Sequence, residues 1–280
     1  MSTSITQLYP QQQSNINLEG LYLSHNIRAL AADGARPFVY ANYIASLDGR
    51  ISVPHPSGQG QMVPKTTTNE RDWRLFQELV AQADVVISSG RYLRDWEDGR
   101  AQEILDVDNP KFADLRAWRE AQGLKPHPDI VIISGSLNFP VPKILTAAGR
   151  KLLIFTTSTA PHKQLNRLRQ ETDHLYITGE QSVDGQQLVN QLKELGYQAI
   201  YNATGPKVMH LLLKANVVNR LYLTYAHRLL GGNPFASIVE GELLETAVTA
   251  QLNALYLDTA FEDNFSQLFA SYDLSNQLTN

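Results

Sequence analysis

Short apolar runs alternate with longer amphipathic segments along most of this 280-residue chain. A continuous apolar run that is too short for a helix is typical of a strand buried on both faces. Such runs occur at residues 38–45, 84–88, 130–133, 152–155, 174–177, 199–201 and 221–225. Each of these segments is therefore predicted to form a strand.

Helical periodicity separates the predicted strands. Thr67 and Glu70 have the spacing of a capping box, and the apolar residues Trp73, Phe76 and Val80 follow at steps of three and four. Further helices are predicted over residues 161–170, 184–195 and 206–214. Strands that alternate with helices in this way indicate βαβ units, whose parallel strands form a central sheet flanked by helices.

The two ends of the chain depart from this alternation. Residues 254–258 and 265–272 resemble strands with no helix between them, which predicts an antiparallel C-terminal hairpin at the edge of the sheet. Residues 1–17 are rich in Ser and Gln and poorly patterned, so we expect a tail, and residues 18–32 are expected to form a short amphipathic helix. The predicted fold class is α/β, with an N-terminal tail and short helix over residues 1–34 and a single domain over residues 35–280.

Composition narrows the chemistry. Cysteine is absent, which excludes disulfides, thiolate zinc ligands and a cysteine nucleophile. The 24 Lys and Arg residues against 28 Asp and Glu residues give a net charge of −4, so we expect no bulk attraction to nucleic acid or to an anionic membrane. No apolar run approaches the roughly 20 residues that cross a bilayer, and no secretory signal is visible, so a cytoplasmic protein is expected. The histidines are scattered without an H-E-x-x-H motif, and no metal site is predicted.

Small and hydroxylated residues follow most of the predicted strands. In open α/β sheets, ligands bind beyond the carboxyl ends of the strands, so these positions predict a cofactor site. Plain turns use the same residue types, and this alternative stays open at each position. The segments concerned are residues 46–49, 89–91, 134–135, 156–157, 178–179 and 204–206.

Gly205 and Pro206 follow a predicted strand and open a predicted helix. Glycine lets a ligand approach the backbone, and the free N–H groups of a helix N-terminus attract a diphosphate, to which Lys207 would add charge. The Ser-Gly-Arg sequence at residues 89–91 suits an anionic group such as the 2′-phosphate of NADP. Neither of the two common nucleotide-binding fingerprints, the Rossmann glycine motif and the P-loop, occurs in the chain.

Asp48 follows the first of the predicted strands. A carboxylate at that place could orient a substrate or relay a proton. The alternative is a turn aspartate that bonds its own backbone, which is the commoner role on local sequence alone. No G-x-S-x-G motif occurs, so a serine hydrolase is not expected.

Three segments, in this order along the chain, resemble one family. They are residues 36–51, which contain Ala45-Ser46-Leu47-Asp48-Gly49-Arg50-Ile51, residues 83–90, and residues 205–232, which end in Leu229-Leu230-Gly231-Gly232. The arrangement is similar to that of the riboflavin-biosynthesis reductase domain. This domain is the C-terminal half of the bifunctional deaminase–reductase (RibD) and shares its fold with dihydrofolate reductase.

The resemblance implies NADPH as cofactor and hydride delivery to a phosphorylated ribosylamino-pyrimidine, as in 5-amino-6-(5-phosphoribosylamino)uracil reductase. It implies that Asp48 acts in catalysis and lies, with Ala45, near the nicotinamide. The other cofactor contacts that we expect are Ser89, Gly90, Arg91, Tyr92, Ser134, Thr156, Thr204, Gly205, Pro206, Lys207 and Val208. A chain without cysteine lacks the zinc ligands of a deaminase, so a stand-alone reductase is expected.

The chain departs from the family's pattern at two positions that meet the substrate and at one position in the cofactor loop. Ala203 stands where the family has a glutamate, Tyr92 where it has a threonine, and Val80 where it has an arginine. Two alternatives therefore stay open: a reductase of another pyrimidine or of a pterin, and a catalytically degenerate relative that binds a nucleotide. The apolar C-terminal hairpin is compatible with a homodimer, and burial of the same residues in the core explains their apolar character equally well.

Overall fold

The computed structural model describes residues 4–56, 60–259 and 265–275 of the chain. They form two compact units, each built from stretches that are separated in sequence. Unit 1 comprises the described residues up to His25, residues 39–78 and the described residues from Gly205 onward. Unit 2 comprises residues 26–38 and 79–204, so both units draw on the segment predicted as one domain.

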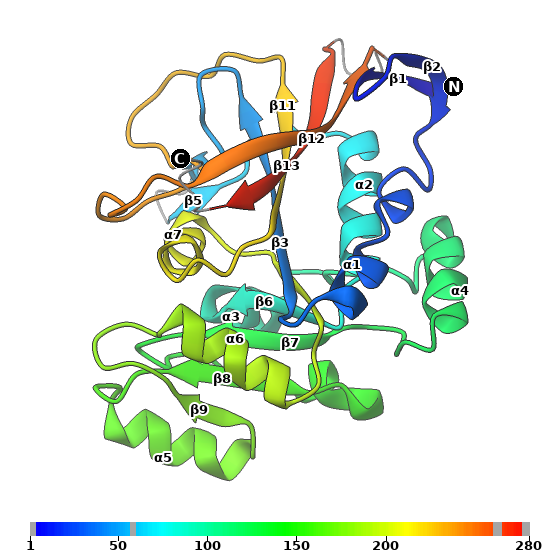
Figure 1. The fold of residues 1–280 in the computed structure, drawn as a ribbon. Helices are drawn as coiled ribbons and strands as arrows, with labels where there is room; N and C mark the ends of the chain where they lie inside the picture. Colours follow the sequence, from blue (N-terminus) through cyan, green and yellow to red (C-terminus); the bar gives the residue numbers. More distant parts are fainter. Residues whose placement is uncertain (1–3, 57–59, 260–264, 276–280) are drawn as a thin grey trace. The chain divides into compact units, whose positions relative to one another are not determined.

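Unit 2 contains a parallel sheet that matches the predicted βαβ pattern (Figure 1). Its strand order is β10-β6-β7-β8-β9, and each of these neighbouring pairs is parallel. Nearly every residue of β6, β7, β8 and β10 is buried, which explains why the sequence shows continuous apolar runs there instead of alternation. The strands are β6 (Val85–Ser89), β7 (Asp129–Ile133), β8 (Leu152–Thr156), β9 (Leu175–Ile177) and β10 (Ala199–Asn202).

Helices connect the strands of unit 2, and the two that the periodicity predicted there are confirmed. α6 begins directly after Asp184, whose side chain accepts a hydrogen bond from the Gln187 N–H at 2.8 Å. α3 and α4 lie in charged stretches to which the periodicity assigned no element. The helices are α1 (Ile27–Asp33), α3 (Gly90–Glu97), α4 (Ala113–Ala121), α5 (His162–Glu171) and α6 (Gly185–Glu194), with 3₁₀ turns at Pro110–Phe112 and Lys143–Gly149.

Unit 1 contains a mixed sheet with the strand order β2-β1-β12-β13-β11-β3. β3 and β11 are parallel neighbours, with Ala45 opposite Tyr225 and Ser46 opposite Ala226. β12 and β13 form the predicted antiparallel hairpin, which joins the rest of the sheet through β13 and β11. The strands are β1 (Ser4–Tyr9), β2 (Gln13–Asn17), β3 (Phe38–Ser46), β11 (Arg220–Ala226), β12 (Thr249–Asp258) and β13 (Gln267–Ser275). These strands and the helices between them confirm the α/β fold class.

Three further elements belong to unit 1. The predicted helix α7 (Pro206–Lys214) is confirmed, and a 3₁₀ turn lies at Leu23–His25. A separate two-stranded pair is formed by β4 (Val53–Pro54) and β5 (Gln61–Met62).

The expectation of a tail over residues 1–17 is wrong for residues 4–17, while residues 1–3 lie outside the described part of the chain. β1 pairs antiparallel with β12, and β2 pairs with β1. Strand pairing at a sheet edge uses backbone groups, so it needs little apolar patterning in the side chains, and the sequence signal is weak. The helix predicted over residues 18–32 forms only over its second half, as α1.

The segment between β2 and α1 is held by α2 (Glu70–Ala81) instead of by its own helical bonds. The carboxylate of Glu78, which is fully buried, accepts hydrogen bonds from the N–H groups of Gly20 at 2.6 Å and Tyr22 at 2.8 Å. Leu18, Leu21 and Tyr22 are buried, as the predicted amphipathic face requires, although their backbone is not helical. A distant buried carboxylate thus replaced the local hydrogen bonds that the periodicity had suggested.

α2 begins at Glu70, two residues after the start that a capping box at Thr67 would give, and its cap is a different residue. The Asn69 side chain accepts hydrogen bonds from Arg71 N at 3.0 Å and Asp72 N at 2.9 Å. Trp73 and Phe76, which the periodicity placed on the buried face, are only partly buried and stack on each other with centroids 4.9 Å apart. The buried positions of α2 include the polar residues Asp72, Arg74, Gln77 and Glu78.

Candidate functional site

Unit 2 brings several of the predicted residues to one edge of its sheet. β6, β7 and β8 are parallel neighbours, so their carboxyl ends lie at the same edge. Ser89 ends β6 opposite Ile133, Ser134 follows β7, and Thr156 ends β8. This is the edge at which open α/β sheets bind ligands.

Three buried polar atoms at these strand ends have no hydrogen-bond partner among the described residues. They are the hydroxyl Oγ1 atoms of Thr156 and Thr178 and the amide Nδ2 of Asn202. The Asn202 Oδ1 atom is occupied, because it accepts the Thr204 hydroxyl at 2.5 Å. Burying a polar group without a partner costs about 1–3 kcal/mol, so three of them at one set of strand ends indicate a place for a polar ligand. Asn202 was missed in the sequence because it lies between the predicted strand over residues 199–201 and the turn segment over residues 204–206, whereas the structure makes it the last residue of β10.

The segment from Ser89 to Tyr92 makes contacts within the protein. A Cβ atom on Gly90 would lie 2.7 Å from Cδ1 of Phe139, so the packing of that ring already requires glycine. Arg91 bonds to Asp95 through Nε at 3.3 Å. The Tyr92 hydroxyl donates to the Gln102 carbonyl at 3.3 Å, and burial raises the pKa of Tyr92. Of the side chains in this segment, Arg91 is exposed, and Ser89 and Tyr92 are partly buried.

The other predicted loop residues of unit 2 have mixed surroundings. The Ser134 hydroxyl accepts the Leu137 N–H at 3.0 Å and so closes a local turn. Val80, at the position of the family's arginine, is fully buried. The N–H of Ala203 donates a hydrogen bond to the Ile87 carbonyl at 3.0 Å, and this bond continues the pairing of β10 with β6.

In unit 1, the N-terminus of α7 has the features predicted for diphosphate binding. Gly205 is the residue before the first helical turn, and a Cβ added there would meet nothing within 4 Å. The φ angle of Gly205 is −76°, which any residue can adopt, so the backbone conformation does not require glycine. The absence of a side chain instead leaves open space beside the helix N-terminus. Lys207 is exposed in the first turn of the helix. The N–H of Val208 already donates a hydrogen bond to the Gly205 carbonyl, at 3.2 Å.

Asp48 lies in the loop after β3 and accepts hydrogen bonds from two separate parts of unit 1. Its carboxylate accepts the Ser46 hydroxyl at 2.5 Å and the guanidinium of Arg50 at 2.7 Å. It also accepts the N–H groups of Gly231 at 2.8 Å and Leu230 at 3.2 Å. The Ser46 hydroxyl and the Gly231 N–H lower the pKa of Asp48 to about 2, with further contributions from Leu230 and Arg50. The group is therefore an anion throughout the physiological pH range.

The predicted site residues are divided between the units. Ala45, Asp48, Gly205, Pro206, Lys207 and Val208 belong to unit 1. Ser89, Gly90, Arg91, Tyr92, Ser134, Thr156 and Thr204 belong to unit 2.

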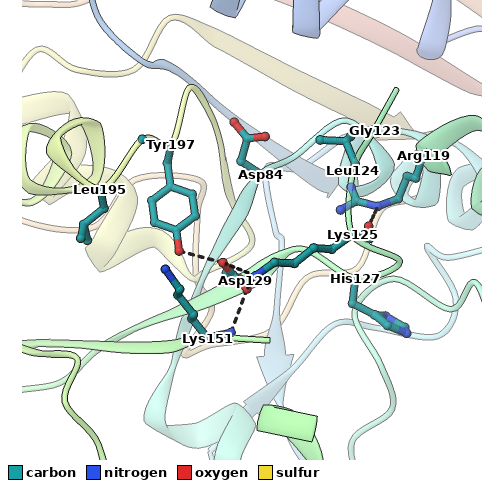
Figure 2. Close-up of a pocket in the computed structure, with 11 residues that line it drawn as sticks. Asp84, Arg119, Gly123, Leu124, Lys125, His127, Asp129, Lys151, Leu195 and Tyr197 are labelled. Atoms are coloured by element: carbon teal, nitrogen blue, oxygen red, sulfur yellow. Dashed lines mark hydrogen bonds and ion pairs between the residues drawn. The ribbon is translucent and has the colours of Figure 1, made fainter. Parts of the chain in front are cut away.

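A pocket of about 300 Å³ in unit 2 lies at the opposite, N-terminal ends of the strands (Figure 2). Asp129, the first residue of β7, accepts hydrogen bonds there from the Lys125 ammonium at 3.0 Å, the Tyr197 hydroxyl at 2.8 Å and the Lys151 N–H at 2.8 Å. Asp84 is bonded by Arg28 and by two backbone N–H groups. The carboxylates of Asp129 and Asp84 thus have hydrogen-bond partners within the protein. They link the segments that precede the strands. None of the predicted site residues lines this pocket.

The described residues lack both a metal-binding cluster and a membrane-spanning helix. They contain no group of three or more His, Cys, Asp or Glu residues arranged to hold a metal ion. Among them, no helix has both the length and the apolar character needed to cross a membrane.

The parallel sheet of unit 2, with unsatisfied polar groups at the carboxyl ends of its strands, defines an α/β protein of the kind that binds a ligand at that edge. The chain belongs to the RibD C-terminal domain family, since the family model matches residues 37–260. Most of the described chain lies within this match, while β1, β2, α1 and β13 lie outside it.

Two curated proteins are similar to the chain, and both are named 2,5-diamino-6-ribosylamino-4(3H)-pyrimidinone 5′-phosphate reductase. The one from Archaeoglobus fulgidus is 26% identical over 208 residues, which cover 74% of this chain and 88% of the relative. The one from Aquifex aeolicus is 21% identical over 208 residues, which cover 74% of this chain and 84% of the relative.

Solved structures show the same fold at low sequence identity. A pyrimidine reductase-like protein from Corynebacterium diphtheriae matches with a TM-score of 0.64 at 16% identity, over 86% of this chain and 93% of that one. The riboflavin biosynthesis reductase Rib7 of Saccharomyces cerevisiae matches with a TM-score of 0.55 at 16% identity, over 91% of this chain and 99% of that one.

Proposed function

We propose that this chain is an NADPH-dependent reductase that acts on a phosphorylated ribosylamino-pyrimidine. The names of the two curated relatives support the reaction and the substrate class, because the matched segments cover most of each relative. The main structural support for a bound cofactor is a set of buried polar atoms, on Thr156, Thr178 and Asn202, that have no hydrogen-bond partner among the described residues. A ligand that bonded to these atoms would remove the cost of burying them.

Cofactor contacts are proposed in each unit separately. In unit 2 we assign them to Ser89, Gly90, Arg91, Tyr92, Ser134, Thr156 and Thr204, together with Asn202. Within this set Tyr92 would contribute its ring or backbone, because its hydroxyl is donated to Gln102. In unit 1 we assign them to Ala45 and to the first turn of α7, where Gly205, Pro206, Lys207 and Val208 combine open space, a helix N-terminus and a positive charge.

NADPH, when bound, supplies a hydride to an electrophilic carbon of the substrate. The protein's share of that reaction is to bind and orient the two molecules. Asp48 is suited to orientation and poorly suited to proton donation, because its low pKa keeps it ionised near neutral pH. The proton that must accompany the hydride is therefore assigned to water or to the substrate's own groups.

A second candidate is a reductase of another pyrimidine or of a pterin. Ala203 and Val80 favour it, because both lack the charged side chains that the family pattern has at these positions. Full burial of Val80 also means that this position offers no polar contact to a ligand. The remaining alternative, a nucleotide-binding relative without activity, would keep the cofactor residues and lose turnover.

Cofactor titration, followed by an assay of substrate-dependent NADPH oxidation, separates these functions. We expect NADPH to bind at micromolar concentration and NADH more weakly, with nicotinamide fluorescence as the readout. We then expect NADPH oxidation to depend on the ribosylamino-pyrimidine phosphate and not on dihydrofolate. Oxidation with dihydrofolate alone would favour the second candidate, and binding of NADPH without any turnover would favour the inactive relative. Failure to bind either cofactor at millimolar concentration would overturn the reductase proposal.

Three accompanying proposals concern the protein as a whole. Residues 35–280 act as one reductase domain after an N-terminal segment of residues 1–34, the protein works in the cytoplasm, and it forms a homodimer. The match of the family model from residue 37 supports the start of the domain. Sedimentation equilibrium tests the dimer, for which a monomer mass at micromolar concentration would be the contrary result.

A further inference from the structure

Two loops leave neighbouring parallel strands of unit 1 at the same edge of the sheet. Residues 47–52 follow β3, and residues 227–236 follow β11, whose last residues pair with those of β3. Backbone hydrogen bonds already join the loops: Leu47 N donates to the Arg228 carbonyl at 2.8 Å, and Ile51 N donates to the Ala236 carbonyl at 2.9 Å. We call the two loops together the clasp.

Gly231 and Gly232 give the second loop of the clasp an unusual backbone. Their φ angles are +65° and +86°, in the left-handed region that glycine adopts without strain. In this conformation the N–H groups of Leu230 and Gly231 converge on the carboxylate of Asp48. A pair of backbone N–H groups that converge in this way forms an anion-binding concavity. Here the anion is a side chain of the protein, so the concavity is occupied by Asp48.

Arg50 completes the clasp from the same loop as Asp48. Its guanidinium bonds the Asp48 carboxylate at 2.7 Å and the Gly232 carbonyl at 3.1 Å. The same group lies over the ring of Phe235, 4.3 Å from the centroid. Arg50 therefore neutralises Asp48 and also bonds to Gly232 and covers Phe235 in the second loop.

The clasp presents apolar side chains to solvent. Leu47 is 56% exposed and Leu229 is 76% exposed, even though both are apolar and lie beside the hydrogen-bonded residues of the clasp. The internal bonds of the clasp thus hold apolar surface at the ligand-binding edge of the β3–β11 pair.

We propose that Asp48 and Arg50 are positioning residues, which hold the Leu230–Gly232 backbone in the shape that the reductase reaction requires. This inference rests on the proposed function for its catalytic part. Asp48 acts as a permanent anion that accepts hydrogen bonds, and it transfers no proton to the substrate. The backbone N–H groups of the Leu-Leu-Gly-Gly sequence bind the carboxylate of Asp48, so they are not a binding site for a substrate phosphate.

Amide hydrogen exchange tests the clasp without reference to activity. In Asp48→Ala the amides of Leu230 and Gly231 lose their acceptor, and we expect their exchange to accelerate about tenfold. Asp48→Asn keeps one neutral acceptor, so its exchange should fall between that of the wild type and that of Asp48→Ala. Arg50→Lys should spare these two amides more than Asp48→Ala does. Asp108→Asn is the matched control, because it removes an exposed carboxylate that pairs with Arg116 in unit 2, and it should change neither amide.

Steady-state kinetics of the same variants then separates positioning from proton transfer. Positioning predicts that kcat/KM falls in the order of the exchange effects, with Asp48→Asn retaining more activity than Asp48→Ala. Equal activity of the two variants, both far below the wild type, would overturn positioning in favour of proton transfer. Unchanged exchange of both amides in Asp48→Ala would overturn the clasp itself. A wild-type protein without any NADPH oxidation would instead overturn the proposed function, while the exchange data would still report on the clasp.

Discussion

The Thr224 hydroxyl donates a hydrogen bond at 2.7 Å to the carboxylate of Asp72, which lies buried on α2 in unit 1. Burial raises the pKa of Asp72 from 3.8 to about 6, because the ionised form loses its hydration, and the Thr224 bond offsets only part of this loss. A carboxylate on the buried side of a helix is thus kept neutral in mildly acidic solution.

The raised pKa of Asp72 predicts a pH-dependent effect of Asp72→Asn. The folded protein holds the proton at pH values where the unfolded chain has released it, so stability falls as pH rises from about 4 through about 6. Asn removes this ionisation and still accepts the Thr224 bond. We expect the free energy of unfolding to increase by about 3 kcal/mol at pH 8 and to change little at pH 4. Urea denaturation at both pH values is the measurement, and an equal effect at both would contradict the assignment.

Glu78→Ala is expected to release the N-terminal segment. The substitution leaves the N–H groups of Gly20 and Tyr22 without their acceptor, and it removes the carboxylate beside the buried guanidinium of Arg74. We expect the unfolding free energy to fall by about 3 kcal/mol and exchange to increase in residues 18–23. Exchange mass spectrometry checks the second effect. Glu19→Ala is the control, because Glu19 is exposed in the same segment, and equal behaviour of the two variants would rule out this role of Glu78.

Two glycine variants distinguish a packing glycine from a binding glycine. Gly90→Ala places a methyl group 2.7 Å from the Phe139 ring, so we expect a loss of about 1–3 kcal/mol of stability. Gly205→Ala meets open space, so its stability should stay within about 0.5 kcal/mol of the wild type. If the first turn of α7 holds the cofactor diphosphate, Gly205→Ala should nevertheless weaken NADPH binding. Thermal melts and NADPH titration provide both readouts, and a stable Gly90→Ala protein would contradict the packing argument.

Thr156→Val tests whether the buried hydroxyl at the end of β8 serves a ligand. Without cofactor the hydroxyl has no described partner, so the methyl group of Val should leave stability unchanged or raise it by about 1 kcal/mol. With cofactor we expect the Kd for NADPH to increase about fivefold to tenfold, as for one lost hydrogen bond. Thr224→Val is the matched comparison, because its hydroxyl has the partner Asp72, and it should cost stability. An unchanged Kd in Thr156→Val would remove Thr156 from the cofactor site.

Much of the parallel architecture follows from the sequence. Strands buried on both faces must be apolar throughout, so β6, β7, β8 and β10 are visible as short continuous runs. Helices α5, α6 and α7 are visible because each begins at a residue with a local role, proline in two cases and the cap Asp184 in the third. These signals lie within each segment, so the strands and helices can be predicted without knowing which distant residues they contact.

The sequence by itself determined the α/β class, the strand-end positions worth testing, and the exclusion of cysteine chemistry. Only the tertiary structure decided that Gly90 is a packing residue, that Asn202 and Thr178 carry unpartnered buried atoms, and that residues 4–9 and 13–17 are strands. It also decided that the carboxylate of Asp48 is bonded to Leu230 and Gly231, 182 and 183 residues further along the chain. The physical reason is common to all these cases: the surroundings of each group come from residues distant in sequence, and hydrogen bonding and packing depend on distance in space, which local residue patterns do not encode.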